Sequence, residues 1–211
     1  MNCILTDMHP EILSPEQKSL LPLVKLFRRE FYLVGGTAIA LQIGHRKSID
    51  FDLFKPTSFN TKKILDKIDS KNYRYIVTRR VSEQLNLSIL DVKVTFFEYP
   101  YPIEVELDFD KTIRMPDLLS LAAMKSFALG RRSKWKDYVD IYFLLKNYFK
   151  VGDIVRKAES IYNQEFSEKL FRAQLAYHLD IDFTEEVDFM EGFHVDREVV
   201  KSFLIDQSLK E

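Results

Sequence analysis

The segment from Phe31 to Phe54 constrains the fold of this 211-residue chain more than any other part of the sequence. It reads FYLVGGTAIALQIGHRKSIDFDLF, which predicts a short apolar strand, a glycine pair, a short helix closed by Gly44, and a second strand of alternating polarity. A strand, a helix and another strand in this order indicate an α/β unit. The second strand carries Asp50 and Asp52, and residues two apart on a strand share one face.

The glycine pair and the aspartate pair together predict a site for a nucleoside triphosphate (NTP). Two carboxylates this close repel each other, and a bound cation removes that penalty. Because Mg²⁺ prefers one or two carboxylates with water and phosphate oxygens, we expect Asp50 and Asp52 to bind Mg²⁺. Gly35 and Gly36 stand where a helix begins, and the free N–H groups of a helix start favour phosphate. Either feature alone is more often an ordinary turn or strand end.

The order of the remaining elements predicts an α/β half followed by a helical half. Helices are expected after Ser14 and near 58–70, and strands near 73–80, 85–90, 92–99 and 103–108. From Pro116 onward the pattern is helical, and the acidic tail after Asp180 is weakly periodic. We therefore expect an α/β (α+β) fold, a mixed sheet flanked by helices with a mainly helical C-terminal half, divided into domains 1–112 and 113–211.

Composition narrows the function classes only a little. Hydrophobic residues make up 46% and charged residues 30% of the chain, which is ordinary for a soluble globular protein. The net charge of -1 gives no bulk argument for nucleic-acid binding. A single cysteine, no long apolar run and no secretory signal favour a cytoplasmic protein that does not associate with membranes.

The segment Leu33–Phe54 resembles the signature of the DNA polymerase β-like nucleotidyltransferase superfamily, a Gly-Gly or Gly-Ser loop followed by Asp-x-Asp on the next strand. It is most similar to the AbiEii-type nucleotidyltransferase toxins of bacterial toxin–antitoxin and abortive-infection systems. The later LLSLAAMKSFALGRRSKWKDYVDIYFLL is similar to the second conserved block of that family. The resemblance implies a nucleotidyltransferase fold and Mg²⁺-dependent transfer of a nucleoside monophosphate from an NTP. It also implies, in many cases, a tRNA acceptor, and a cognate antitoxin protein as a possible partner.

The resemblance also suggests roles for individual residues. The nucleotide-binding set would be Gly35, Gly36, Thr37, His45, Arg46 and Ser48, with Gly36 and Thr37 offering backbone N–H groups to phosphate. Lys125 would neutralise charge on the triphosphate, and Asp137 and Asp140 would support the site.

The residues of the second block also allow simpler interpretations. Lys125 lies on the apolar stripe of its helix, so it either extends to solvent or has an anionic partner. Asp137 and Asp140 share a helix face, where Asp137 could complement the helix start and Lys136 could pair with Asp140.

Charge is distributed unevenly in the second half of the sequence. Seven basic residues and one acid occupy 111–136, whereas eight acids and one basic residue occupy 180–198. Both stretches could be solvated faces. The basic stretch, which contains Trp135, could instead meet the phosphates of an RNA acceptor.

One position departs from the superfamily pattern. A third carboxylate is expected on a neighbouring strand, but VKVTFFEYPYP places Thr95 there, and a threonine cannot be an anionic ligand. Glu104, Glu106 or Asp108 could substitute. The leading hypothesis is transfer to a hydroxyl acceptor such as a tRNA 3′ end. The alternatives are a catalytically impaired nucleotide- or RNA-binding protein of the same fold, and a small-molecule nucleotidyltransferase of the antibiotic-modifying kind.

Overall fold

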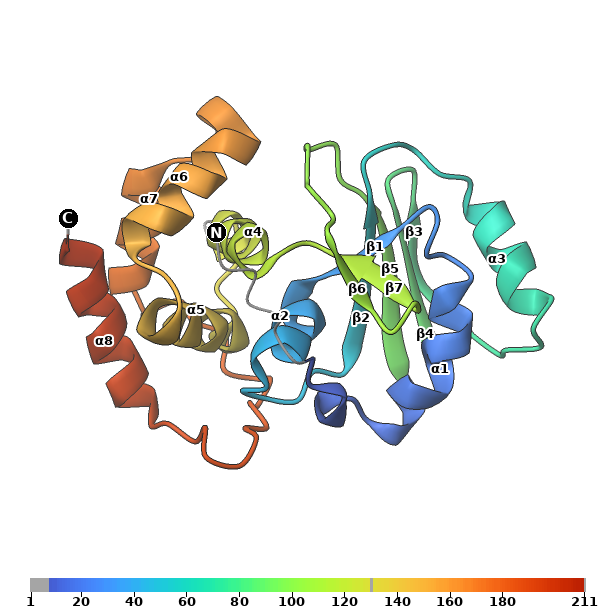
Figure 1. The fold of residues 1–211 in the computed structure, drawn as a ribbon, viewed down its shortest axis with the longest axis horizontal. Coiled ribbons are helices and arrows are strands. Elements are labelled where there is room, and N and C mark those ends of the chain that lie inside the picture. The colour runs from blue at the N-terminus through green and yellow to red at the C-terminus, as the bar shows by residue number, and fades with distance from the viewer. Residues whose placement is uncertain (1–7, 130, 211) are drawn as a thin grey trace. The chain divides into compact units, whose positions relative to one another are not determined.

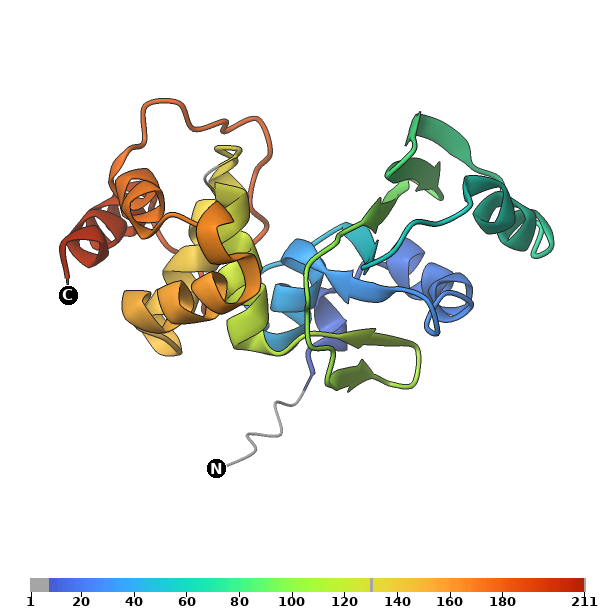
Figure 2. The same cartoon turned by 90° about the horizontal axis from the view of Figure 1, so that it is seen from above.

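The computed structural model describes residues 8–129 and 131–210, so Cys3 lies outside it, and it divides into two compact units between Asp117 and Leu118 (Figure 1). The boundary expected from the sequence, after residue 112, would separate β6 (Leu107–Phe109) from β7 (Ile113–Met115). These two strands pair with each other as an antiparallel hairpin, visible in Figure 2, so the division falls after the hairpin.

The first unit is built on a five-stranded mixed sheet with the strand order β1-β2-β5-β4-β3. The strands β2 and β5 run parallel, and the other neighbouring pairs are antiparallel. The strands are β1 (Tyr32–Val34), β2 (Asp50–Lys55), β3 (Ile76–Val81), β4 (Gln84–Ile89) and β5 (Val92–Glu98). The helices are η1 (Pro10–Ile12), α1 (Pro15–Lys25), α2 (Gly35–Ile43) and α3 (Thr61–Asp69). The mixed α/β fold expected from the sequence is confirmed.

Local sequence signals fix the helix ends in this unit. Helix α1 begins with a capping box, in which the Ser14 side chain accepts from the Gln17 backbone and the Gln17 side chain accepts from the Ser14 backbone. Helix α2 ends at Gly44, whose left-handed φ of 68° suits a residue without a Cβ. Asn60 caps α3 by accepting hydrogen bonds from two backbone N–H groups of its first turn.

The two faces of the sheet have opposite characters. On one face, Phe51 and Leu53 of β2 and Phe96 of β5 are almost fully buried. Phe27, just after α1, packs edge-to-face on Phe96 with ring centroids 4.8 Å apart. Each such aromatic or aliphatic side chain contributes about 1.5–3 kcal/mol by burial. The other face of β2 carries Asp50 and Asp52, which are half-buried, whereas Val34 and Thr95, the register partners of Asp52, are buried.

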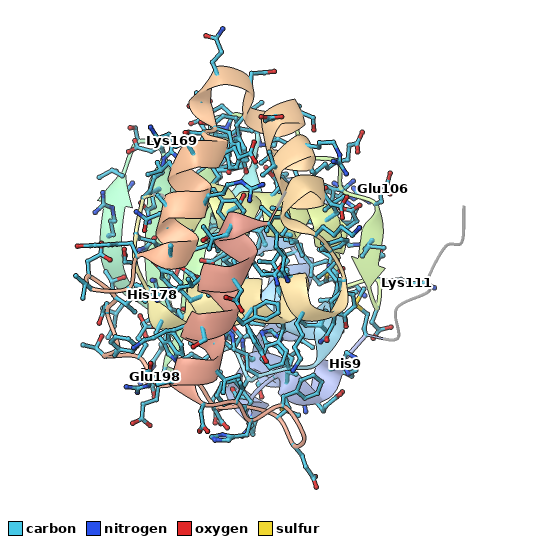
Figure 3. All side chains as sticks on the ribbon, turned by 90° about the vertical axis from the view of Figure 1, so that its left-hand side faces the viewer. His9, Glu106, Lys111, Lys169, His178 and Glu198 are labelled. Atoms are coloured by element: carbon cyan, nitrogen blue, oxygen red, sulfur yellow. The ribbon has the colours of Figure 1, made fainter. Side chains whose placement is uncertain are left out.

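The second unit is helical. It contains α4 (Leu118–Leu129), α5 (Trp135–Asn147), α6 (Val151–Tyr162), η2 (Asn163–Glu165), α7 (Glu168–Ala176) and α8 (Arg197–Leu209). Helix α4 is buried on nearly every side, which agrees with its apolar sequence. Helices α7 and α8 pack together, with exposed Lys169 on α7 and Glu198 on α8 (Figure 3). In the part of the chain that the structure describes, no helix is both long and apolar enough to cross a membrane.

Two elements differ from the sequence-based expectations. The strand expected over 103–108 exists only as Leu107–Phe109, and residues 103–106 are irregular. Pro100 and Pro102 directly precede this segment and lack backbone N–H donors, which agrees with the late start of the strand. Helix α8 was not predicted, because only Val200, Leu204 and Ser208 of its residues are buried. Three residues at a spacing of four give too narrow an apolar stripe for detection.

Candidate active site

The glycine pair joins β1 directly to α2. Val34 ends the strand and also stands at the N-cap position of α2, where it provides no capping hydrogen bond. Gly35 adopts a left-handed φ of 74°, which turns the chain within a single residue. The first N–H groups of α2 are therefore not used by a cap side chain, as a phosphate-binding loop requires.

Both glycines are also needed because of what lies against them. A Cβ atom at Gly35 would overlap the Asp52 Oδ2 atom, and a Cβ atom at Gly36 would overlap the Arg46 guanidinium. The same Cβ at Gly36 would lie 3.3 Å from Ser48 Oγ. The absence of side chains on the loop thus lets a carboxylate and a guanidinium come close to the start of α2.

A hydrogen-bonded connection holds the segment between α2 and β2 in place. The Thr37 hydroxyl lies 2.9 Å from the Ser48 Oγ atom and donates to the backbone carbonyl of Asp50. His45 is fully buried and Arg46 is 4% exposed. The Arg46 guanidinium donates to the Lys47 carbonyl at 2.9 Å. The structure therefore brings the predicted nucleotide-binding residues of the first unit together around the glycine loop.

Asp50 and Asp52 lie on one face of β2, as the alternation predicted. In the parallel register, Asp52 stands directly beside Thr95 of β5, and Thr95 stands beside Asn86 of β4. Thr95 is 6% exposed, so its side chain is buried beside Asp52. The register therefore places Thr95, the residue that the sequence resemblance matches to a third carboxylate, directly beside Asp52.

Sequence reasoning missed the amide pair on β4 in this row. The Gln84 side-chain amide donates to Asn86 Oδ1 at 2.9 Å, which orients the Asn86 amide next to Thr95. The signal was present in the alternation of QLNLSI, where Leu85 and Leu87 are fully buried and the polar residues face the other way. A carboxylate, a hydroxyl and an amide thus form one continuous row.

The substitute carboxylates proposed from the sequence do not complete the pair. Glu104 and Glu106 are exposed in the irregular segment, and Asp108 on β6 forms an ion pair with Arg28. Over residues 8–129 and 131–210, no three acidic, histidine or cysteine side chains gather as a metal-binding group. Two carboxylates still fit Mg²⁺, which proteins often hold through one or two carboxylates plus substrate phosphate.

A hollow of about 720 Å³ in the first unit lies elsewhere. Ser58, Asn60, Thr61 and Arg80 are among the residues that line it, and none of the predicted site residues is. Arg80 is in register with the buried Leu85, so this hollow belongs to the face of the sheet opposite Asp50 and Asp52.

In the second unit, Lys125 has anionic partners and does not extend to solvent. It is 4% exposed, and its Nζ atom lies 2.7 Å from Asp137 Oδ1 and 2.9 Å from Asp140 Oδ2. Both carboxylates are fully buried. Arg132 adds a second cation, with Nε 2.8 Å from Asp137 Oδ2. The two aspartates therefore hold Lys125 and join α4 to α5.

These cations decide the protonation state of Asp137. Burial acts to raise the pKa of this carboxyl, but the charges of Lys125 and Arg132 outweigh burial and hold its pKa below the ordinary value. Asp137 therefore stays ionised at neutral pH.

The acidic tail contacts the end of the basic stretch, at residues 133–136. Residues 133–135 pair with residues around Asp182, since the Trp135 N–H donates to the Asp182 carbonyl at 3.0 Å. Lys134 and Lys136 both form ion pairs with Glu185. Burial would raise the pKa of Glu185, but hydrogen bonds from the two lysines lower it to about 2. Part of the positive charge that suggested an RNA surface is thus balanced within this unit.

Comparison with known proteins adds a family model and one sequence relative. The model, described as nucleotidyl transferase AbiEii toxin of a type IV toxin–antitoxin system, matches residues 23–109 and 72–200. The protein aq_aa25 of Aquifex aeolicus (strain VF5), described as uncharacterized, is 35% identical over 127 residues. This match covers 56% of the chain and 59% of the relative, so the chain spans less than two thirds of that relative's length.

Solved structures share the fold. A candidate nucleotidyltransferase from Helicobacter pylori superposes with a TM-score of 0.59 at 19% identity, over 92% of this chain and 91% of that chain. MenT4, a nucleotidyltransferase toxin from Mycobacterium tuberculosis H37Rv, superposes with a TM-score of 0.58 at 14% identity, over 91% and 81% of the two chains. At these identities the likeness concerns the nucleotidyltransferase fold alone.

Proposed function

Because the chain belongs to the AbiEii family of nucleotidyl transferase toxins, we propose that it transfers a nucleoside monophosphate from an NTP to a hydroxyl acceptor. The bond that breaks joins the α- and β-phosphates, and pyrophosphate leaves. The bond that forms joins the acceptor oxygen to the α-phosphorus, and the proton of the acceptor hydroxyl passes to solvent.

The close approach of Asp52 to Gly35 and of Arg46 to Gly36 is the single observation that carries this proposal. The Asp52 carboxylate, the Arg46 guanidinium and the uncapped start of α2 converge on one loop, with Asp50 two residues before Asp52 on the same strand, and a metal-bound triphosphate requires this combination. In this proposal the backbone N–H groups of Gly36 and Thr37 and the Arg46 guanidinium bind phosphate oxygens.

Asp50 and Asp52 are the residues that would hold Mg²⁺. When bound, the ion would supply positive charge to phosphate oxygens and lower the repulsion between the triphosphate and the two carboxylates. The Thr37 hydroxyl fixes the start of β2 through the Asp50 carbonyl and so positions both carboxylates relative to the loop. Lys125 lies in the second unit, where Asp137 and Asp140 hold its Nζ atom, and there it positions α4 against α5.

Thr95 and Asn86 determine what the acceptor meets next to Asp52. A threonine hydroxyl and an amide can hydrogen-bond an acceptor hydroxyl, but neither can take its proton at neutral pH. We expect transfer to be slower than with a carboxylate at position 95. For the same reason, a nucleotide-binding protein without efficient transfer is the second candidate function.

The toxin role, the antitoxin partner and the tRNA acceptor rest on the family description and on the sequence resemblance. The ion pairs of Lys134 and Lys136 with Glu185 make the basic stretch a weaker argument for RNA than its sequence suggests. A tRNA 3′ end nevertheless offers the hydroxyl that the proposed chemistry needs.

Incubation with each α-labelled NTP and Mg²⁺ tests the proposal. Parallel reactions contain total tRNA, small hydroxyl compounds of the aminoglycoside class, or no acceptor, and Asp50→Asn/Asp52→Asn is the inactive control. Label on tRNA supports the toxin reaction, and label on a small compound supports the antibiotic-type alternative. Calorimetric NTP binding without label transfer supports the binding protein, whereas absence of both binding and transfer rejects the proposal.

A further inference from the structure

A row of aromatic side chains lies next to the proposed metal site on the same face of the sheet. Phe54 follows Asp52 by two residues on β2, and Phe97 follows Thr95 by two residues on β5. The parallel register pairs Phe54 with Phe97 just as it pairs Asp52 with Thr95. The aromatic row therefore stands about 6.6 Å along the strands from the carboxylate row.

Two more aromatic rings extend this row. The Phe54 and Phe97 ring centroids are 5.1 Å apart, and the Tyr99 ring lies 5.0 Å from that of Phe54. The Tyr101 ring packs on Tyr99 at 4.8 Å. We call Phe54, Phe97, Tyr99 and Tyr101 the aromatic shelf. Phe54 and Phe97 lie on the sheet face opposite Phe51 and Phe96; Tyr99 is buried, and Phe54, Phe97 and Tyr101 remain partly exposed to solvent.

Beside the shelf lies a buried hydroxyl that has no hydrogen-bond partner among the residues the structure describes. Tyr32 of β1 is in register with Phe54, and it is 5% exposed. Its hydroxyl makes no hydrogen bond to another residue of the described chain. Burial raises the pKa of Tyr32, with a further contribution from nearby Tyr99, so the hydroxyl remains a hydrogen-bond donor. An unused buried donor at the edge of a partly open aromatic surface points to a ligand with both a flat ring and an acceptor atom.

We propose that the aromatic shelf binds a nucleobase by stacking, one sheet row away from the carboxylates Asp50 and Asp52. This inference rests on the proposed function, because it assumes that a nucleotide occupies the carboxylate row. Aromatic side chains stack on every base, since each base has a π-face, and polar edges of the base offer acceptors to a donor such as Tyr32. The spacing of the two rows is comparable to the ribose that separates a base from its phosphate.

The base has two possible sources with the same chemistry, the donor NTP and the end of a nucleic-acid acceptor. The test therefore compares three probes by calorimetry with Mg²⁺ present: inorganic tripolyphosphate, NTPs and a short single-stranded oligoadenylate. The variants are Phe54→Leu and Phe97→Leu, which stay apolar but lose the aromatic face. Phe193→Leu, a half-buried phenylalanine of the second unit, is the matched control.

The expected result is a loss of at least tenfold in nucleotide affinity in both shelf variants, with tripolyphosphate affinity unchanged. A loss confined to NTPs assigns the shelf to the donor base, and a loss confined to the oligoadenylate assigns it to the acceptor base. Unchanged affinity for both nucleotide probes overturns the inference, even if a protein partner is later found to need the shelf. Failure of the wild-type chain to bind tripolyphosphate and NTPs overturns the proposed function and this inference with it. Unchanged tripolyphosphate binding also shows that the leucine variants keep the native site.

Discussion

Replacing Lys125 with methionine tests whether this residue mainly holds the second unit together. The wild-type network contains the cations Lys125 and Arg132 and the carboxylates of Asp137 and Asp140, so its formal charges balance. Lys125→Met keeps most of the apolar stem but leaves two fully buried carboxylates facing one cation. Breaking a buried ion pair by removing one partner costs about 3–5 kcal/mol, because a buried charge is left uncompensated.

Urea unfolding followed by tryptophan fluorescence measures this loss in the correct unit. The chain has one tryptophan, Trp135, which is 4% exposed at the start of α5 in the second unit. We expect the midpoint for Lys125→Met to fall by an amount equivalent to about 3–5 kcal/mol, a large share of the ~5–15 kcal/mol typical of a domain.

A compensating variant separates charge balance from simple loss of packing. Lys125→Met/Asp140→Asn leaves Arg132 opposite Asp137, so the formal charges balance again. The double variant should be more stable than Lys125→Met, with a coupling free energy of about 2 kcal/mol or more between the two positions. A loss below ~1 kcal/mol in Lys125→Met, or strict additivity in the double variant, would show that the network is not the stabilising feature described above.

The same pair of variants decides whether Lys125 also acts on the triphosphate. Weak NTP binding in Lys125→Met alone is uninformative, because the second unit is destabilised in that variant. If the stable double variant binds Mg²⁺-NTP normally, Lys125 is only a positioning residue. If the double variant stays at least tenfold weaker, about 1.4 kcal/mol, Lys125 also contributes its charge to nucleotide binding.

Three further predictions concern the loop, the carboxylates and pH. Asp50→Asn/Asp52→Asn should abolish Mg²⁺-dependent NTP binding in calorimetry without lowering stability, and unchanged affinity would reject the metal assignment. Gly35→Ala should weaken Mg²⁺-NTP binding and lower the free energy of unfolding by more than the ~1–2 kcal/mol of left-handed backbone strain. Gly192 is the control, because it has a φ of 82° and no atom within 4 Å of an added Cβ, so Gly192→Ala should show the strain alone. The pKa values of Asp137 and Glu185 are lowered by folding, so their stabilisation is complete above the unfolded values near pH 4–4.5 and is lost as the pH falls through the lowered pKa of each, about 2 for Glu185. Glu185→Gln should reduce that acid sensitivity in urea titrations at pH 6, 4 and 3, and an unchanged slope would contradict the assigned cause.

The fold and the arrangement of the candidate-site residues in the first unit could be largely predicted because their signals are local. The alternation of SIDFDLF determines which face Asp50 and Asp52 share, and Gly44 marks the end of α2 without knowledge of the rest of the chain. The partners of Lys125 lie 12 and 15 positions further along the sequence. The apolar stripe shows that Lys125 needs an anion, but only the packing of α4 on α5 identifies it.

The balance between the basic and acidic stretches could not be predicted for a similar reason. Glu185 is about 50 residues from Lys134 in the sequence, and nothing in its own neighbourhood indicates a contact with the first turn of α5. The same limit applies to the row from Asp52 to Asn86, because strand order is a long-range property. The polar alternation of β4 was visible, whereas its position next to Thr95 was not.

Thr95→Asp tests whether the difference from the superfamily pattern is purely chemical. The register already places residue 95 beside Asp52, so an aspartate needs no change in the backbone to join the pair. A positioned base contributes about 10²–10⁴-fold to proton transfer, so with Mg²⁺ and an acceptor we expect at least tenfold faster label transfer from NTP. NTP affinity should change little, because Asp50 and Asp52 already provide the carboxylates that Mg²⁺ needs.

Without metal the Thr95→Asp variant should lose stability, by about 1.4 kcal/mol for each unit by which repulsion raises the pKa of the new carboxyl. Faster transfer with unchanged NTP affinity would assign the missing step to proton removal. An unchanged rate together with robust wild-type activity would show that this chain transfers nucleotides without a third carboxylate, so Thr95 would not be the limiting residue.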